Sequence, residues 1–236
     1  MKNDRKSPRR LWPGGFLYAG DPVSADSLAL ADFVSVTAGH GCDLGCGSGI
    51  LLLSLLWAHP GLVMDGVELR SGAARECREN LFQNGLALRG SVENADLRSC
   101  SLVPGVYDLV VSNPPYFPAG CGRSSPTEER RLMREESATL PELCAAAAAL
   151  LRQHGRFALV HRPERQQEVF SAMEDAGIVP LRHRSFACCE GAEPSFFLCE
   201  GERGGSGALQ KEAPLFQFDA RGQETPEYKR ITHWEA

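Results

Sequence analysis

The residues of this chain best suited to do chemistry form the segment Ser112–Phe117, which reads Ser-Asn-Pro-Pro-Tyr-Phe and ends the apolar run Tyr107–Val111. Two prolines fix the backbone and remove two N–H donors, while their carbonyl oxygens remain acceptors. The amide oxygen of Asn113, the carbonyl oxygen of Pro114 and the ring of Tyr116 can then converge on one point. This combination suits a planar group that carries an NH2, and we predict that these three residues are catalytic.

A glycine-rich stretch lies upstream, at Asp43–Gly49, directly before the apolar segment Ile50–Ala58. Glycines allow positive φ and a close approach of the backbone to a ligand, and the N-terminus of a following helix favours an anionic group. The D-x-G-x-G-x-G spacing differs from the G-x-G-x-x-G of dinucleotide-binding loops and fits S-adenosylmethionine better. The cofactor contacts predicted from this loop are Asp43, Gly45, Cys46, Gly47 and Gly49.

Two acidic residues extend the predicted cofactor site. Glu68 follows the next predicted strand, 25 residues after Asp43, where a carboxylate can accept hydrogen bonds from both ribose hydroxyls. The alternative for Glu68 is a surface acid beside Arg70. Asp96 follows a third predicted strand and can accept from an adenine amino group, or it only forms a turn. The cofactor contacts predicted beside these acids and upstream of the loop are Leu69, Leu97 and Asp21.

The order of predicted elements decides where these motifs meet. Strands are predicted at 41–44, 62–67, 86–92, 106–111 and 156–160, and helices at 24–36, 50–58, 72–84, 140–152 and 163–176. An antiparallel pair is predicted at 182–188 and 195–200. This alternation indicates an α/β, doubly wound, Rossmann-like sheet that is mostly parallel, with a C-terminal antiparallel strand at or near its edge. Ligands bind such sheets outside the carboxyl ends of the strands, where all three motifs fall.

Composition and charge indicate one soluble domain with short extensions. The chain has 236 residues, 43% of them hydrophobic and 23% charged, and a net charge of -5, which argues against wholesale electrostatic binding to nucleic acid. We predict a flexible basic arm at 1–13, a main domain at 14–202 and a C-terminal extension at 203–236. Residues 1–10 hold five cations and one anion, so the arm either contacts phosphates or only aids solubility.

The nine cysteines show no paired Cys-x-x-Cys ligand pattern. We therefore predict no metal site, and reduced thiols in a cytoplasmic protein. The charged start of the chain does not indicate a signal peptide, and the longest apolar run, Ile50–Ala58, is too short to span a bilayer. No membrane partner is expected.

Together, the glycine loop, Glu68, Asp96 and the Asn-Pro-Pro-Tyr turn resemble the class I S-adenosylmethionine-dependent methyltransferases, in particular the group that methylates amino groups. Several flanking segments are similar to those of the bacterial tRNA1(Val) adenine-N6-methyltransferases: residues 16–34, the stretch after the turn, Arg162–Arg165 and the C-terminal PLFQFDARGQETPEY. This likeness covers about residues 14–230. One difference is Glu135, which stands where that family often has a histidine.

The resemblance implies methylation of the N6 amine of the adenine at tRNA position 37, beside the anticodon. Asn113 and Pro114 would hold the amine for direct in-line attack on the methyl group, with the extruded base stacked on Tyr116. The RNA contacts predicted are Phe117, Arg123, Arg134, Arg162 and Arg165. Glutamates interleave with these arginines, so solvated helix charge also explains them, and Phe117 could equally belong to the core.

Three other functions remain open. The same turn can hold a glutamine side-chain amide, as in the protein-glutamine N5-methyltransferases that act on release factors, although their entry segments differ from residues 16–32. DNA adenine methylation uses the same chemistry, but no DNA-recognition domain is evident. A non-catalytic, cofactor-dependent RNA-binding module would bind the cofactor without methyl transfer.

Overall fold

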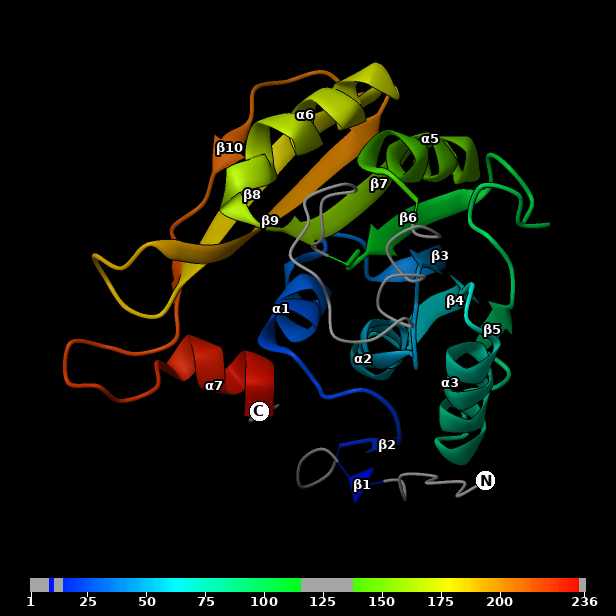
Figure 1. Cartoon of the computed structure of the whole chain (residues 1–236), viewed down its shortest axis with the longest axis horizontal. Coiled ribbons are helices and arrows are strands. Elements are labelled where there is room, and N and C mark those ends of the chain that lie inside the picture. The colour runs from blue at the N-terminus through cyan, green and yellow to red at the C-terminus, as the bar shows by residue number, and fades with distance from the viewer. Residues whose placement is uncertain (1–8, 11–14, 116–137, 234–236) are drawn as a thin grey trace, which may run out of the picture.

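The computed structural model describes residues 9–10, 15–115 and 138–233. A central twisted sheet carries helices on both faces (Figure 1). The strands, in their spatial order, are β10 (Gln210–Lys211), β8 (Ile178–Ala187), β9 (Pro194–Arg203), β7 (Leu151–His161), β6 (Tyr107–Ser112), β3 (Ala38–Leu44), β4 (Gly61–Val67) and β5 (Gly90–Glu93). A further short strand, β11 (Leu215–Phe216), also pairs with β8.

The sheet confirms the predicted α/β architecture. The pairs from β5 through β4, β3 and β6 to β7 are all parallel. The antiparallel strand, β9, is inserted between β7 and β8, and β10 and β11 cover the outer edge of β8. The antiparallel strand therefore lies near the edge of the sheet, and shorter strands close that edge.

The helices form two layers. One face of the sheet is covered by α1 (Ala25–Phe33), α2 (Ile50–Ala58) and α3 (Ser71–Gln83), and the other face by α5 (Leu140–Leu150) and α6 (Gln166–Asp175) (Figure 1). Helix α2 is covered on all sides, because every residue from Leu51 to Leu56 is buried. Within the described ranges, no helix is both long and apolar enough to cross a membrane.

Most predicted elements differ in extent from those observed, and three of the differences are instructive. The strand predicted at 86–92 shrinks to β5, because Leu86 accepts turn hydrogen bonds from Arg89 and Gly90 at the end of α3. The helix predicted at 140–152 ends at Leu150, because the next residue is extended and pairs with Tyr107 of β6. The helix predicted at 163–176 divides into a 3-10 turn and α6.

Both ends of the described chain pack on the domain. Residues 9–10 form β1 (Arg9–Arg10), which pairs with β2 (Leu17–Tyr18), so part of the predicted basic arm is a strand. At the other end, α7 (Pro226–His233) lies against α1, and its Ile231 joins the core that α1 and α2 share (Figure 1). Two hydrogen bonds from the guanidinium of Arg230 to Asp32 fasten α7 to α1.

Candidate active site

The predicted motifs leave the sheet at one edge. Strand register pairs Asp43 of β3 with Val111 of β6 on one side and with Gly66 of β4 on the other. Asn113 follows Val111 by two residues, and Glu68 follows Gly66 by two residues. The carboxyl ends of three neighbouring strands therefore bring the glycine loop, the Asn-Pro-Pro turn and the acid of β4 together, as a doubly wound sheet requires.

The glycine loop has the backbone of a ligand cradle. Gly45 and Gly47 have φ of 79° and 56°, in the left-handed region that favours glycine. The N–H groups of Gly45 and Cys46 both donate to the carbonyl oxygen of Val67, at 2.8 and 3.1 Å, which ties the loop to β4. Among the described residues other than its two chain neighbours, a Cβ atom at Gly45 would meet no atom within 4 Å, so these residues leave open space beside the loop.

Two predicted contacts in this loop have a packing role. A Cβ atom at Gly49 would lie 2.4 Å from the sulfur of Cys77 on α3, so this glycine lets two helices approach. The side chain of Cys46 is buried against Gly66 of β4. Its backbone is engaged as well, because its N–H donates to Val67 and its carbonyl oxygen accepts from the N–H of Gly49.

Glu68 is buried and shapes the loop. Its Oε2 accepts a 2.8 Å hydrogen bond from the backbone N–H of Gly47, and its Oε1 accepts from the backbone and the guanidinium of Arg70. With 7% of its side chain exposed, Glu68 is not a surface acid, although the expected contact with Arg70 exists. Arg70 also lies 3.8 Å from the exposed carboxylate of Asp21, which places Asp21 at the rim of the site.

Asp43 is the buried acid at the centre of this edge. Its side chain is 1% exposed, and no described residue hydrogen-bonds to its Oδ2. Burial, and then the nearby carboxylate of Glu68, raise the pKa of Asp43 to about 8, against a hydrogen bond from the backbone of Leu52. A buried carboxylate oxygen without a partner is costly, and a cation beside it removes that cost. S-adenosylmethionine carries an ammonium and a sulfonium, so Asp43 and the open space at Gly45 fit this cofactor.

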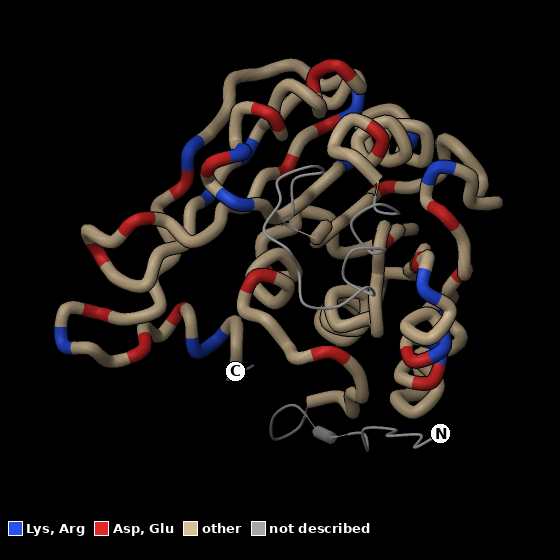
Figure 2. Tube along the Cα trace, in the orientation of Figure 1, with Lys and Arg blue, Asp and Glu red and all other residues tan. Residues whose placement is uncertain are grey.

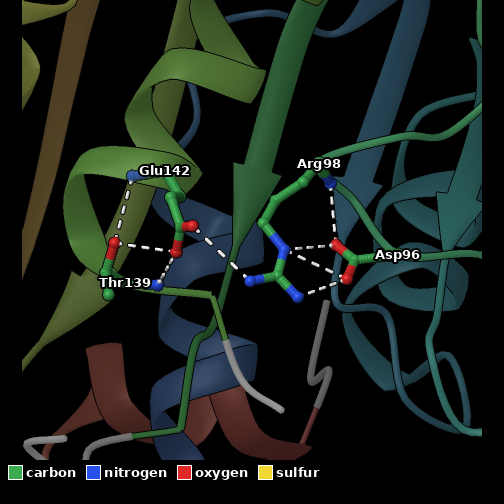
Figure 3. Close-up of polar contacts among 4 residues, drawn as sticks. All are labelled: Asp96, Arg98, Thr139 and Glu142. Carbon is green, nitrogen blue, oxygen red and sulfur yellow. Dashed lines mark hydrogen bonds and ion pairs between the residues drawn. The ribbon is translucent and has the colours of Figure 1, made fainter.

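Asp96 is held by an arginine, as Figure 3 shows. The Nε of Arg98 donates to both oxygens of Asp96, at 2.9 and 3.0 Å. The hydrogen bond from Arg98 also lowers the pKa of Asp96 below its ordinary value. Arg98 reaches on to Glu142, 3.5 Å away, which forms a capping box with Thr139 at the start of α5. The carboxylate of Asp96 is thus oriented and ionised, and both of its oxygens accept from the backbone or the guanidinium of Arg98.

The hydrophobic neighbours of the two acids differ in exposure. Leu69 is 42% exposed beside Glu68, as a residue that packs on a planar ligand would be. Leu97 is only partly accessible because it packs on the apolar core beneath α5.

Asn113 is anchored by a residue that the sequence did not single out. Its Nδ2 donates a 2.8 Å hydrogen bond to the hydroxyl of Ser27, which is buried on α1. Pro114 is half-buried and Pro115 is exposed. Ser27 lies inside a helical pattern with no chemical motif, so only the packing of α1 against the sheet reveals the contact. Four other predicted residues lie outside the described part of the chain: Tyr116, Phe117, Arg123 and Arg134.

The end of β7 adds three charged or titratable residues. Arg162 donates from its guanidinium to the carbonyl of Ser195, at 2.8 Å, and Arg165 pairs with Glu168. His161, which the sequence analysis did not single out, is buried. Burial and the nearby charge of Arg165 lower the pKa of His161 to about 4, so its ring is neutral at pH 7.

Asn80 of α3 and Asn84, which directly follows that helix, were also not predicted, and they fix the entry segment beside the glycine loop. Asn80 bonds the backbone N–H and carbonyl of Ala19, at 2.9 and 2.8 Å, and also the carbonyl of Ser48. Asn84 does the same for Leu17. Their spacing, one helical turn apart, is the sequence signal that could have indicated this contact.

Fold and site together define a Rossmann-like α/β domain of the methyltransferase class, with a glycine-loop cofactor cradle beside an Asn-Pro-Pro turn. The model of the methyltransferase small domain matches residues 15–176. The chain belongs to this family.

Similar proteins agree with this assignment. The tRNA1(Val) (adenine(37)-N6)-methyltransferase of Shigella dysenteriae is 36% identical over 143 residues, which are 58% of this chain and 57% of that protein. The chain thus matches little more than half the length of this curated relative.

Two solved structures share the fold. A crystal structure described as a predicted O-methyltransferase from Agrobacterium tumefaciens has a TM-score of 0.73 at 20% identity, covering 88% of this chain and 95% of that chain. Geranyl diphosphate C-methyltransferase from Streptomyces coelicolor, solved with S-adenosyl-L-homocysteine, has a TM-score of 0.57 at 14% identity, covering 76% and 78%.

Proposed function

We propose that this protein is an S-adenosylmethionine-dependent methyltransferase that acts on the N6 amine of an adenine in tRNA, at position 37. The observation that carries the proposal is the placement of Asn113 and Pro114 at the end of β6, directly beside the glycine loop at the end of β3. The named activity of the Shigella relative supports the substrate class.

The cofactor would occupy the edge between β3, β4 and the loop that holds Asp96. It supplies a methyl group activated by a sulfonium. The backbone of Gly45 and Gly47 would line it, Glu68 and Asp96 would accept hydrogen bonds from it, and Asp43 would balance its positive charge. Leu69 would pack on its base.

The turn would activate the substrate amine. The lone pair of an adenine amine is delocalised into the ring, so the free amine is a poor nucleophile. When the amide oxygen of Asn113 and the carbonyl oxygen of Pro114 accept hydrogen bonds from the two N–H groups of the amine, the lone pair localises on the nitrogen and points at the methyl group. Most of the rate gain would come from positioning and preset dipoles. Tyr116 would stack on the extruded base and contribute about 1–3 kcal/mol.

RNA contact would involve the end of β7. Arg162 and Arg165 lie there, where Arg162 donates to the carbonyl of Ser195 and Arg165 pairs with Glu168, and guanidinium groups are suited to bind phosphates. Basic positions are interspersed with acidic ones across the molecule (Figure 2), so recognition would rest on a few placed arginines and not on a broad positive field. The contacts expected from Phe117, Arg123 and Arg134 remain part of this proposal.

The test is methyl transfer from labelled S-adenosylmethionine to unmodified tRNA transcripts, followed by nucleoside digestion and mass spectrometry. We expect N6-methyladenosine from one tRNA, formed far more slowly with Asn113→Ala. Methylation of a release-factor glutamine in place of tRNA would move the proposal to the protein-glutamine group. Cofactor binding without transfer to either substrate would indicate a non-catalytic module.

A further inference from the structure

We infer that Ser27 is a positioning residue that fixes which end of the Asn113 amide faces the substrate. This inference rests on the proposed function, because it matters only if the oxygen of Asn113 accepts from a substrate amine. An asparagine amide is nearly symmetric in shape, but its two ends are opposite in hydrogen bonding. Turned around, Asn113 would present N–H groups to an amine that itself donates, and the activation would be lost.

A chain of hydrogen bonds starts at the amide. The Nδ2 of Asn113 donates to the Oγ of Ser27, at 2.8 Å. The Oγ of Ser27 lies 3.5 Å from the Oγ of Ser24, and the hydroxyl of Ser24 donates to the carboxylate of Asp26. The backbone N–H of Ser27 also donates to that carboxylate, at 2.7 Å. Four residues, three of them at the start of α1, therefore form one network.

The carboxylate at the end gives the chain its direction. An ionised carboxylate only accepts hydrogen bonds, so the proton of Ser24 is committed to Asp26. In the 3.5 Å contact between the two hydroxyls, Ser24 can then only accept, so this long contact directs the proton of Ser27 toward Ser24. The hydroxyl of Ser27 is left as an acceptor, and it selects the NH2 end of Asn113. Asp26 thus sets the direction of each hydrogen bond in the chain, through the hydroxyls of Ser24 and Ser27 to the amide of Asn113.

Rigid surroundings make this selection effective. Ser27 is 3% exposed, and its neighbours Leu28, Ala29 and Leu30 are buried in the core that α1 shares with α2 and the sheet. The backbone of Ser27 therefore cannot move away from the turn without unpacking the helix. Burial also strengthens the hydrogen bond, because the local dielectric is low.

The first test is Ser27→Ala, matched with Ser54→Ala. Ser54 is also buried and helical, but its hydroxyl bonds the carbonyl of Ile50 in its own helix, α2. We expect Ser27→Ala to lower kcat about tenfold, on the scale of one neutral hydrogen bond, with unchanged cofactor affinity and melting temperature. Ser27→Thr, which keeps the hydroxyl, should restore most of the rate, and Ser24→Ala should lower it less. Ser54→Ala should leave kcat unchanged.

A double-mutant cycle separates positioning from a general structural effect. If Ser27 acts through Asn113, Ser27→Ala causes no further loss of kcat in the Asn113→Ala background. Equal kcat in the Ser27→Ala and Ser54→Ala proteins would overturn the inference while the proposed function stands. The inference would also be overturned if Ser27→Ala lowered kcat, cofactor affinity and melting temperature together. Normal turnover by Asn113→Ala would instead remove the proposed function, and this inference with it.

A measurement without substrate closes the test. In the 15N-labelled protein, the side-chain NH2 resonances of Asn113 are identified by their loss in Asn113→Ala. We expect Ser27→Ala to shift one of these protons upfield, as loss of its acceptor requires, and Ser54→Ala to leave it in place. An unshifted resonance would show that the contact does not exist in solution.

Discussion

The hydroxyl of Ser112 donates a 2.7 Å hydrogen bond to the carbonyl oxygen of Leu44, and both residues are buried. Leu44 is the last residue of β3, directly before the glycine loop, and Ser112 is the last residue of β6, directly before Asn113. One hydrogen bond, from a side chain to a backbone carbonyl, therefore joins the strand end that leads into the turn to the strand end that leads into the cofactor loop. It sets the spacing between the proposed methyl donor and the proposed amine holder.

Ser112→Ala should weaken both stability and catalysis. Loss of the hydroxyl deprives the buried carbonyl of Leu44 of a partner, which costs roughly 1–3 kcal/mol. We expect urea denaturation to show this loss in unfolding free energy, and kcat to fall because the loop and the turn drift apart. Ser91→Ala, which removes an exposed hydrogen bond to Asp65, is the control. If the two variants behave alike, the bond has no special role.

Asn113→Ala should abolish most turnover without disturbing the fold. Removing one preorganised polar partner costs roughly 10²-fold or more in kcat. Cofactor affinity and melting temperature should stay near those of the wild type, because the side chain of Asn113 lies beyond the end of β6 and not in the core. Single-turnover kinetics with tRNA measures the effect. Near-normal turnover would remove Asn113 from the mechanism.

Asp43 predicts a pH dependence of stability. In the unfolded chain this carboxyl ionises near 3.8, and in the folded protein its pKa is about 8. Between these values the folded protein holds a proton that the unfolded chain has lost, so stability falls as the pH rises, by at most about 1.4 kcal/mol per pH unit. Asp43→Asn should flatten this decline in denaturant titrations between pH 5 and 8. An equally steep decline in the variant would contradict the assignment.

The same carboxyl makes cofactor binding proton-linked. A cation beside Asp43 favours its ionised form, so binding at pH 7 should release close to one proton and affinity should rise toward pH 8. Calorimetry of S-adenosylmethionine binding in buffers of different ionisation enthalpy measures that proton. If the Asp43→Asn protein released the same proton on binding, another group would have to supply it.

Glu68→Gln should weaken the cofactor site through the loop. The carboxylate accepts from Gly47 and Arg70 at once, and an amide can accept at only one end. Breaking a buried, charge-assisted hydrogen bond costs a few kcal/mol, so we expect cofactor affinity to fall at least tenfold. Glu93→Gln, which alters an acid that bonds the backbone of Ser101 away from the glycine loop, should retain affinity. Equal affinities for the two variants would argue that Glu68 only packs.

Arg162→Ala and Arg165→Ala should weaken tRNA binding and its salt dependence. If each arginine binds one phosphate, its removal should reduce the slope of log affinity against log salt by about 0.7–0.9. The control is Arg152→Ala, because Arg152 pairs with Asp108 at the opposite ends of β7 and β6. Filter binding across a salt series makes the comparison. Unchanged slopes at 162 and 165 would leave these arginines as surface ion pairs.

Local patterns were sufficient for most of the fold. The apolar run Ile50–Ala58 predicted α2 with the same bounds. A continuous apolar run of this length indicates a buried helix or strand, and its position directly after a glycine loop favoured the helix. The predicted helix end at residue 152 was wrong, because α5 ends at Leu150 and β7 begins at Leu151. Pairing with β6, a nonlocal contact, decided that boundary.

By itself the sequence determined the doubly wound sheet and the residues at its carboxyl edge, Asp43, Glu68, Asp96 and Asn113, because periodicity, glycine spacing and proline chemistry are local. Only the tertiary structure decided which of their atoms are already engaged. It assigned Arg98 to Asp96, Gly47 to Glu68 and Ser27 to Asn113, and it gave Asp43 its raised pKa. These properties depend on burial and on partners distant in the chain, which no local pattern records.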